Sequence, residues 1–174
     1  MKTVPTAFAA LALLAPAASA HVNITPSEAP QGATFVGALG VGHGCDGEST
    51  LKLRVQIPEG VIAVKPTPKP GWDLEIVTGA FEKSYEHHGA TVSEGVKELI
   101  WTGELPDAYF DTFSFRGALT DAFPAGSTVY FPVVQECATA ARRWVEIPAE
   151  GQNAHDLDAP AAGLKVTAPG HGHH

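Results

Sequence analysis

Short apolar stretches separated by glycine and proline limit this chain to β-structure. Residues 51–57 (Leu-Lys-Leu-Arg-Val-Gln-Ile) alternate apolar and polar side chains, the period-two pattern of a strand with one buried face. Residues 112–117 alternate in the same way, and no segment has a convincing 3.6-residue apolar period of an amphipathic helix. Short strands with turns about every 8–12 residues predict an all-β fold, an antiparallel β-sandwich.

Further strands and one tail can be placed along the chain. Pro132 falls within one expected strand and marks an edge or a bulge there, because proline cannot donate to a sheet ladder. Residues 79–95 are polar and predict a hairpin that carries His87 and His88, and Trp72 and Trp101 are expected in the core or as loop supports. The segment 151–174 is rich in Ala, Pro and Gly and predicts a flexible tail after a domain at 21–150. The remaining strands are expected at residues 34–39, 61–64, 74–78, 98–102, 127–134 and 142–147.

Residues 1–20 have the three parts of a secretory signal peptide. Lys2 gives a positive start, residues 7–15 are apolar, and Ala18-Ser19-Ala20 is a cleavage site of small residues. Cleavage after Ala20 predicts an exported protein. No later apolar run reaches the ~20 residues that a membrane helix needs, so no span is expected in the mature chain. The net charge of −8 disfavours nucleic acid and anionic lipid as partners and tolerates metal cations.

The chain contains two cysteines, Cys45 and Cys137. An even number of cysteines in an exported protein predicts one disulfide. The alternative is a pair of thiolate metal ligands.

Cleavage after Ala20 would make His21 the first residue of the mature protein. Its new α-amine, with an ordinary pKa near 8, and its imidazole Nδ1 can then close one six-membered chelate ring on a metal. Nitrogen donors in a tetragonal arrangement suit Cu(II), which has the highest affinity among the divalent first-row metals. The position of His21 therefore predicts a copper site that forms only after export.

The other ligands of such a site are open from the sequence. A square-planar amino-terminal motif needs histidine at the third mature position, which is Asn23. A full histidine brace needs a second histidine, for which His43 and His155 are the candidates. A one-histidine site completed by a carboxylate, water or an aromatic ring is the simpler interpretation.

An ordered set of short motifs resembles the YcnI-like family of exported bacterial copper-binding proteins. The resemblance runs from about residue 21 to 148. The motifs are His21-Val22, residues 44–47 (Gly-Cys-Asp-Gly), 57–61 (Ile-Pro-Glu-Gly-Val), 66–72 (Pro-x-Pro-x-Pro-Gly-Trp), 100–103 (Ile-Trp-Thr-Gly), 131–135 (Phe-Pro-Val-Val-Gln) and 144–148 (Trp-Val-Glu-Ile-Pro).

The resemblance implies an Ig-like or cupredoxin-like sandwich that holds Cu(II) at the amine and Nδ1 of His21, which is a one-histidine brace. It also implies a tryptophan against the metal, and Trp144 matches that tryptophan by its place after the Gln135 segment. It further implies copper trafficking outside the cytoplasm, with a membrane copper importer or a small periplasmic copper chaperone as partner. The chain lacks the C-terminal membrane helix of some relatives, which favours a free periplasmic protein.

Carboxylates near Cys45 are candidates to complete the site. Asp46 and Glu48 flank the cysteine in a Gly-rich turn, and a Cys45–Cys137 bridge would tie that turn to the strand leading to Trp144. Two acids in a turn are also typical of a solvated surface. Glu136 and Glu146 are further candidates. His171, His173 and His174 are expected to be exposed, and such a tract can bind metal weakly.

Two other functions compete with copper delivery. A copper-dependent polysaccharide oxidase would also begin with histidine on a β-sandwich, but it needs a second brace histidine and a flat aromatic face. An Ig-like structural module would need no metal. The sequence has no nucleophile elbow, no phosphate-binding loop before a helix and no H-E-x-x-H motif. We therefore expect a copper-binding protein and not an enzyme.

Overall fold

The structure, a computed structural model, describes residues 21–170. The predicted signal peptide and three of the tail histidines lie outside these residues. One 3-10 helix, η1 (Ala154–Asp156), and twelve strands form within them. The strands are β1 Asn23–Thr25, β2 Glu28–Pro30, β3 Thr34–Val41, β4 Thr50–Gln56, β5 Val61–Pro66, β6 Asp73–His87, β7 Ala90–Leu105, β8 Asp111–Leu119, β9 Thr128–Phe131, β10 Val133–Glu136, β11 Ala141–Trp144 and β12 Ala162–Thr167.

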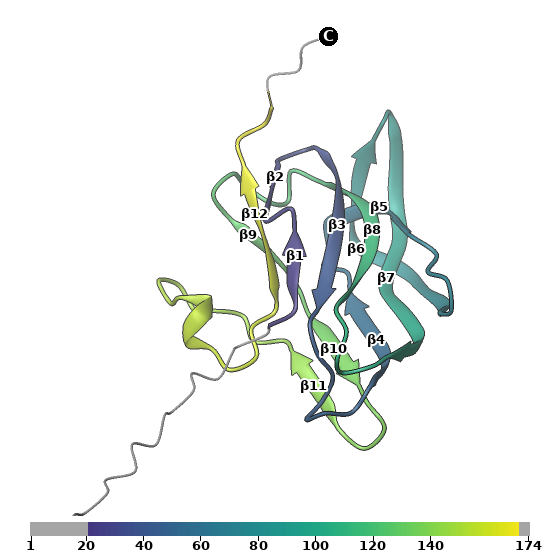
Figure 1. The fold of residues 1–174 in the computed structure, drawn as a ribbon. Coiled ribbons are helices and arrows are strands. Elements are labelled where there is room, and N and C mark those ends of the chain that lie inside the picture. The colour runs from purple at the N-terminus through teal and green to yellow at the C-terminus, as the bar shows by residue number, and fades with distance from the viewer. Residues whose placement is uncertain (1–20, 171–174) are drawn as a thin grey trace, which may run out of the picture.

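Three sheets make up the β-sandwich (Figure 1). One has the order β1-β3-β8-β5, a second has the order β11-β10-β4-β7-β6, and a third, smaller sheet has the order β2-β12-β9. Paired strands are antiparallel except β2 and β12, which run parallel. The prediction of an all-β antiparallel sandwich is confirmed.

Residues from all three sheets share one hydrophobic core. The alternation in residues 51–57 is confirmed for Leu53, Val55 and Ile57, which are buried. Leu51, the first apolar residue of the series, is instead 36% exposed, next to an irregularity in the pairing of β4 with β7 between Thr50 and Lys52. Trp101, as expected, is completely buried, and Trp72 packs edge-on against Phe113 with 4.8 Å between ring centroids. Each fully buried large apolar side chain stabilises the fold by about 1.5–3 kcal/mol.

Pro132 divides the strand expected at residues 127–134 into two. β9 ends at Phe131 and belongs to the small sheet, whereas β10 begins at Val133 and joins β4 and β11. Proline has no N–H for a ladder, but its carbonyl still accepts from the Gln56 N–H at 2.9 Å. The proline thus lies where the chain passes from one sheet to another, which brings the following strand to β11 and Trp144.

The prediction of a flexible tail from residue 151 is wrong for residues 162–167. These form β12, which lies between β2 and β9, and Leu164 and Val166 are fully buried. Their alternation is short and stands within an Ala-, Pro- and Gly-rich segment, so composition obscured it. The domain therefore extends well past residue 150. His171, His173 and His174 lie outside the described residues.

The hairpin expected at residues 79–95 forms, as the ends of β6 and β7, with an irregularity in the pairing between Ala80 and Tyr85. β6 and β7 continue through it as paired strands and turn at His88-Gly89, where both residues have a positive φ. His88 is exposed and His87 is half-buried.

Candidate functional site

His21 lies at the edge of the four-stranded sheet, two residues before β1. Val22 and Ile24 alternate with it and are buried, which fixes this first segment against β3. His21 and Asn23 therefore lie on the opposite side of the segment, because successive side chains of an extended chain point to opposite faces. The sequence at residues 21–24 thus positions the histidine side chain outside the core.

Trp144 contacts His21 from another sheet. It ends the edge strand β11, and the two ring centroids are 5.7 Å apart with an interplanar angle of 62°. Trp144 is only 5% exposed, and it is the buried member of a strand whose other residues are exposed. The structure therefore brings together His21 and Trp144, which the sequence analysis proposed as the centre of the site, although they are far apart in the sequence.

A buried glutamine orients the indole of Trp144. The Trp144 Nε1–H donates to Gln135 Oε1 at 3.2 Å. The Gln135 amide nitrogen in turn donates to the His43 carbonyl and to Thr50 Oγ1, both at 2.6 Å. Gln135 is 1% exposed, so these bonds form away from water, where an unpaired polar group is costly. Gln135 therefore determines which way the indole faces.

Sequence reasoning gave no role to Gln135. A signal was nevertheless present, because residues 131, 133 and 135 share one face of an apolar stretch and glutamine is the polar member. A polar side chain on a buried face needs partners, and these partners can come from distant loops. Its partners His43 and Thr50 precede it by more than 80 residues, and only the fold brings them near.

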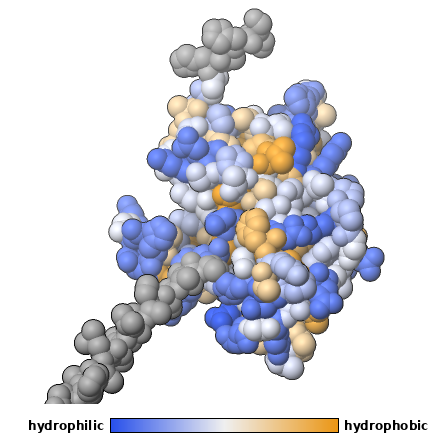
Figure 2. All heavy atoms as spheres, viewed as in Figure 1, coloured by the Kyte–Doolittle hydropathy of each residue, from blue (hydrophilic) through white to orange (hydrophobic). Residues whose placement is uncertain are grey.

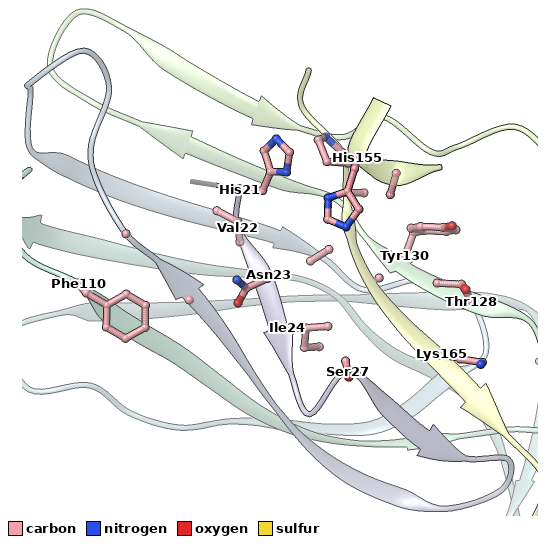
Figure 3. A pocket seen from close by; sticks show the side chains of 17 residues that line it. His21, Val22, Asn23, Ile24, Ser27, Phe110, Thr128, Tyr130, His155 and Lys165 are labelled. Atoms are coloured by element: carbon pink, nitrogen blue, oxygen red, sulfur yellow. The ribbon is translucent and has the colours of Figure 1, made fainter. Parts of the chain in front are cut away.

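A pocket of about 720 Å³ opens beside His21 (Figure 3). Its walls come from residues 21–27, from β9, from β12 and from the loop before it, with Phe110 at the other side. The labelled side chains include a second imidazole, His155, together with Tyr130 and Lys165. No Asp or Glu is among the described residues that line the pocket, although the chain has 19 acidic residues. The pocket wall is therefore neutral to basic in an acidic protein.

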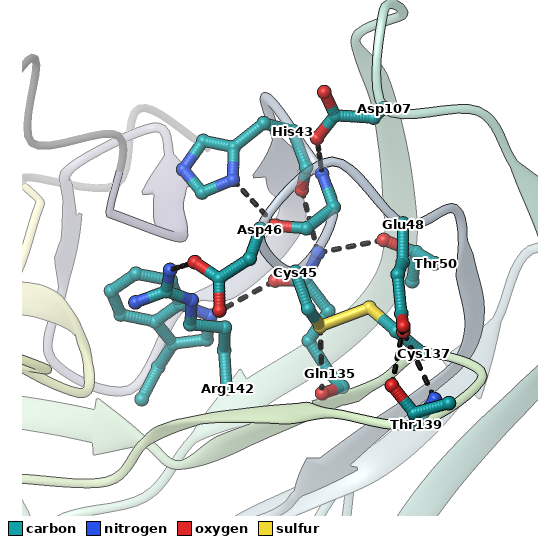
Figure 4. Close-up of a disulfide and its surroundings, with 12 residues drawn as sticks. His43, Cys45, Asp46, Glu48, Thr50, Asp107, Gln135, Cys137, Thr139 and Arg142 are labelled. Atoms are coloured by element: carbon teal, nitrogen blue, oxygen red, sulfur yellow. Dashed lines mark hydrogen bonds and ion pairs between the residues drawn. A yellow bond between two sulfur atoms is a disulfide. The ribbon is translucent and has the colours of Figure 1, made fainter.

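The turn that contains Asp46 and Glu48 lies at the disulfide (Figure 4). Cys45 and Glu48 exchange backbone hydrogen bonds of 3.2 and 3.0 Å across it. Asp46 and Gly47 have φ values of 53° and 91°, which glycine and aspartate tolerate better than most residues. The residue types at 46 and 47 thus suit a tight turn.

Both carboxylates of this turn bind residues near the β10–β11 hairpin. Asp46 forms an ion pair with the Arg142 guanidinium. Glu48 accepts hydrogen bonds from the hydroxyl and the backbone N–H of Thr139. The Thr139 hydroxyl, followed by its N–H, lowers the pKa of Glu48 against the small opposing effect of desolvation. Neither carboxylate lines the pocket beside His21.

Cys45 and Cys137 form the predicted disulfide, with 6.0 Å between their Cα atoms. The bridge joins the turn to the residue after β10, and therefore to the hairpin that carries Trp144. The thiolate-ligand alternative is thereby excluded in this structure, because both sulfur atoms are bonded to each other.

The other candidates are distributed over the surface. His43 does not line the pocket; its Nδ1 lies 2.6 Å from the Gly44 carbonyl oxygen. Glu136 lies 3.8 Å from Lys52 and 3.7 Å from Arg54, and the Glu146 carboxylate accepts the Ala159 N–H at 2.8 Å. Within residues 21–170, no group of three or more His, Cys, Asp or Glu side chains is arranged to hold a metal. Of these four residue types, the described lining of the pocket contains only His21 and His155.

A family model matches residues 21–166, from the histidine to the penultimate residue of β12. The chain belongs to the YcnI-like family. Its domain is described as a domain of unknown function, DUF1775. The matched range includes most of β12, which agrees with its place in the folded domain.

Comparison with solved structures supports the fold. The crystal structure of an uncharacterized protein from Nocardia farcinica, described as an immunoglobulin-like fold, matches with a TM-score of 0.61 and 21% identity. The match covers 84% of this chain and 98% of that one. The YcnI-like domain here is therefore an Ig-like sandwich. No curated protein matches the chain. In the part of the chain that the structure describes, there is no helix with the length and apolarity to cross a membrane.

Proposed function

We propose that this YcnI-like protein binds Cu(II) at His21 after export and delivers it outside the cytoplasm. The observation that carries the proposal is the contact of the His21 ring with Trp144 at the wall of a pocket. A histidine that follows a predicted cleavage site needs no aromatic neighbour for the export step. Binding of a cation by the histidine would explain why its ring lies against the buried and oriented indole of Trp144.

The donor set fits copper. After cleavage, His21 supplies an amine nitrogen and an imidazole nitrogen. Cu(II) binds such nitrogen donors more tightly than the other divalent first-row metals do. The amine must lose its proton to bind, and an ordinary pKa near 8 allows this near neutral pH. Before cleavage the same nitrogen is a peptide N–H, so the site cannot form in the cytoplasm.

Trp144 would limit access to the metal from one side. The face of an indole attracts a cation, and its bulk excludes water from that direction. The hydrogen bond from the Trp144 Nε1–H to Gln135 Oε1 holds the indole in place. The pocket on the other side leaves an approach for a ligand of the acceptor, so that copper can leave by ligand exchange. We expect the acceptor to be a membrane copper importer or a small periplasmic copper chaperone.

Titration of Cu(II) into two forms of the protein tests the proposal. One form begins at His21, and its matched control carries a single additional alanine before His21. Calorimetry and electron paramagnetic resonance should show one tight Cu(II) in the first form and a loss of that site in the control. Equal binding by both forms would place the metal elsewhere, and absence of binding in both would favour the metal-free structural module.

A polysaccharide oxidase makes a different prediction for the same two forms. It would oxidise a polysaccharide when supplied with a reductant and an oxygen co-substrate, and the additional alanine would abolish that activity together with the copper site. We expect copper binding without such turnover. Product formation that depends on the free His21 terminus would overturn the assignment to delivery.

A further inference from the structure

A projecting loop connects β11 to β12 and carries His155. Its base is fixed at Glu146, whose N–H donates to the Ala159 carbonyl at 3.0 Å and whose carbonyl accepts from the Ala161 N–H at 2.8 Å. The Glu146 carboxylate adds a third bond to the Ala159 N–H. The two ends of the loop are thus held together two residues after Trp144, so its position is linked to that of the indole.

The tip of this loop is hydrophilic and lightly packed. In Figure 1 the loop between β11 and β12 projects beside the body of the domain, and Figure 2, in the same view, shows a mainly hydrophilic surface there. None of the residues of η1 is buried. Its hydrogen bonds are local: Asn153 accepts from the His155 N–H with Oδ1 at 3.0 Å and from the Asp156 N–H with its carbonyl at 3.0 Å, and the Leu157 N–H donates to the Ala154 carbonyl at 3.2 Å. A segment with a fixed base and few buried contacts can change position at low cost.

The His155 imidazole reaches the pocket that His21 lines. Both side chains belong to its wall, and Figure 3 draws the two rings on the same side of it. Within residues 21–170 the His155 ring makes no hydrogen bond, because the bond to Asn153 comes from the His155 backbone N–H. The direction of the ring is therefore not set by a hydrogen bond within the described residues.

The chemistry of the pocket favours an imidazole as the second protein ligand. Its described lining has no carboxylate, and Lys165 contributes a positive charge. Asp46 and Glu48, the carboxylates first considered, are bound to Arg142 and Thr139 outside this pocket. A Cu(II) ion at His21 that faces the pocket therefore meets nitrogen, and nitrogen donors suit it.

We propose that His155 supplies a second imidazole to the Cu(II) held at His21. The inference rests on the proposed function and adds to it a ligand on a loop. Movement of the loop would then remove one ligand while the terminal chelate still holds the metal, which opens a coordination position for the acceptor. This arrangement joins retention and release in one site.

The test compares His155→Ala with His88→Ala, an exposed histidine at the far β6–β7 turn, both in the form that begins at His21. Loss of even an outer-shell partner typically lowers metal affinity about 10–100-fold, so loss of a direct ligand should weaken Cu(II) binding by at least about tenfold. His88→Ala should bind as the parent does. Electron paramagnetic resonance should show one coupled nitrogen fewer in His155→Ala.

The outcomes separate this inference from the proposed function. Unchanged affinity and an unchanged spectrum in His155→Ala, with binding still lost when alanine precedes His21, would overturn the role of His155 and leave the terminal site in place. Binding that survives the additional alanine would overturn both. An equal loss in His88→Ala would also overturn the inference, because it would show an unspecific effect of removing a histidine.

Discussion

The turn at Cys45 and the pocket beside His21 both adjoin β11, through Arg142 and Trp144 respectively, and they differ in charge and in bonding. The turn has two carboxylates, and both are bound, one by Arg142 and one by Thr139. The pocket has two imidazoles and a lysine, with no acid in its described lining. The comparison teaches that the acids beside Cys45 in the sequence hold the turn to the hairpin, while the side chains that face the pocket come from other segments.

Removal of the disulfide should have the largest effect, because it should lower the stability of the fold and leave the pocket beside His21 able to bind copper. We expect Cys45→Ala with Cys137→Ala to lower the free energy of unfolding by roughly 2–5 kcal/mol, because the bridge closes a loop of 92 residues and limits the unfolded chain. Urea denaturation of the double variant measures this. At a temperature where the variant is folded, its Cu(II) affinity should stay within about threefold of the parent.

A large loss of copper affinity in the folded double variant would break the comparison. It would mean that the turn belongs to the site and not only to its support. The Cys45→Ala single variant is not a suitable control, because it leaves one reactive thiol.

Gln135→Leu should produce the next largest effect. It leaves the Trp144 indole N–H, the Thr50 hydroxyl and the His43 carbonyl without their partner. Unsatisfied buried groups cost about 1–3 kcal/mol each, and partial relaxation should bring the total to about 2–4 kcal/mol. Urea denaturation measures the stability, and tryptophan emission compared with Trp144→Phe reports the indole.

Gln135→Leu also tests how the indole is held. If the emission of Trp144 is unchanged and stability falls by less than about 0.5 kcal/mol, Gln135 does not orient it and another contact must. Trp144→Phe is the matched control because it removes the N–H donor and retains an aromatic ring.

The strands were predictable because their signal is local. Residues 51–57 and 112–117 show a period of two, and this pattern directly determines which face is buried. β12 was missed because only three apolar positions alternate in it, namely Ala162, Leu164 and Val166, and they follow a segment rich in alanine and proline. The pair Cys45 and Cys137 followed from compartment and count, which do not depend on geometry.

The site was predictable only in part. His21 could be identified because cleavage creates its chemistry, and Trp144 followed from a family resemblance. Gln135 and the pocket could not be predicted, because they depend on β10, β4 and the loop at His43 meeting in space. The position of His155 depends on the backbone hydrogen bonds of Glu146 with Ala159 and Ala161, which close the loop. No short sequence pattern predicts these bonds.

Glu48 predicts a pH dependence that belongs to the turn. Hydrogen bonds from Thr139 lower its pKa below the ordinary value of 4.5. A carboxyl whose pKa is lower in the folded state stabilises the fold above pH ~4.5 and loses this contribution as the pH falls through the folded pKa. Glu48→Gln should therefore remove part of the acid sensitivity of the melting temperature.

Thermal unfolding between pH 3 and 7 measures this effect. Glu48→Gln should be less stable than the parent near pH 7, and the two curves should converge at the acid end. Parallel curves over the whole range would mean that Glu48 does not contribute through its charge. Glu75→Gln, at an exposed position of β6, is a suitable control.

The smallest expected effect comes from Asp46→Asn. This variant tests most directly whether copper binds at the turn or at the pocket beside His21. Asparagine tolerates the positive φ of position 46, so the turn should keep its shape while its charge is lost. The side chain is 76% exposed and its ion pair with Arg142 is worth about 0–1 kcal/mol, so stability should change little. If Asp46 only binds Arg142, copper affinity should be unchanged as well. A loss of copper affinity of about tenfold or more, with the fold intact, would identify Asp46 as a copper ligand. The metal would then lie toward the turn and not in the pocket beside His21.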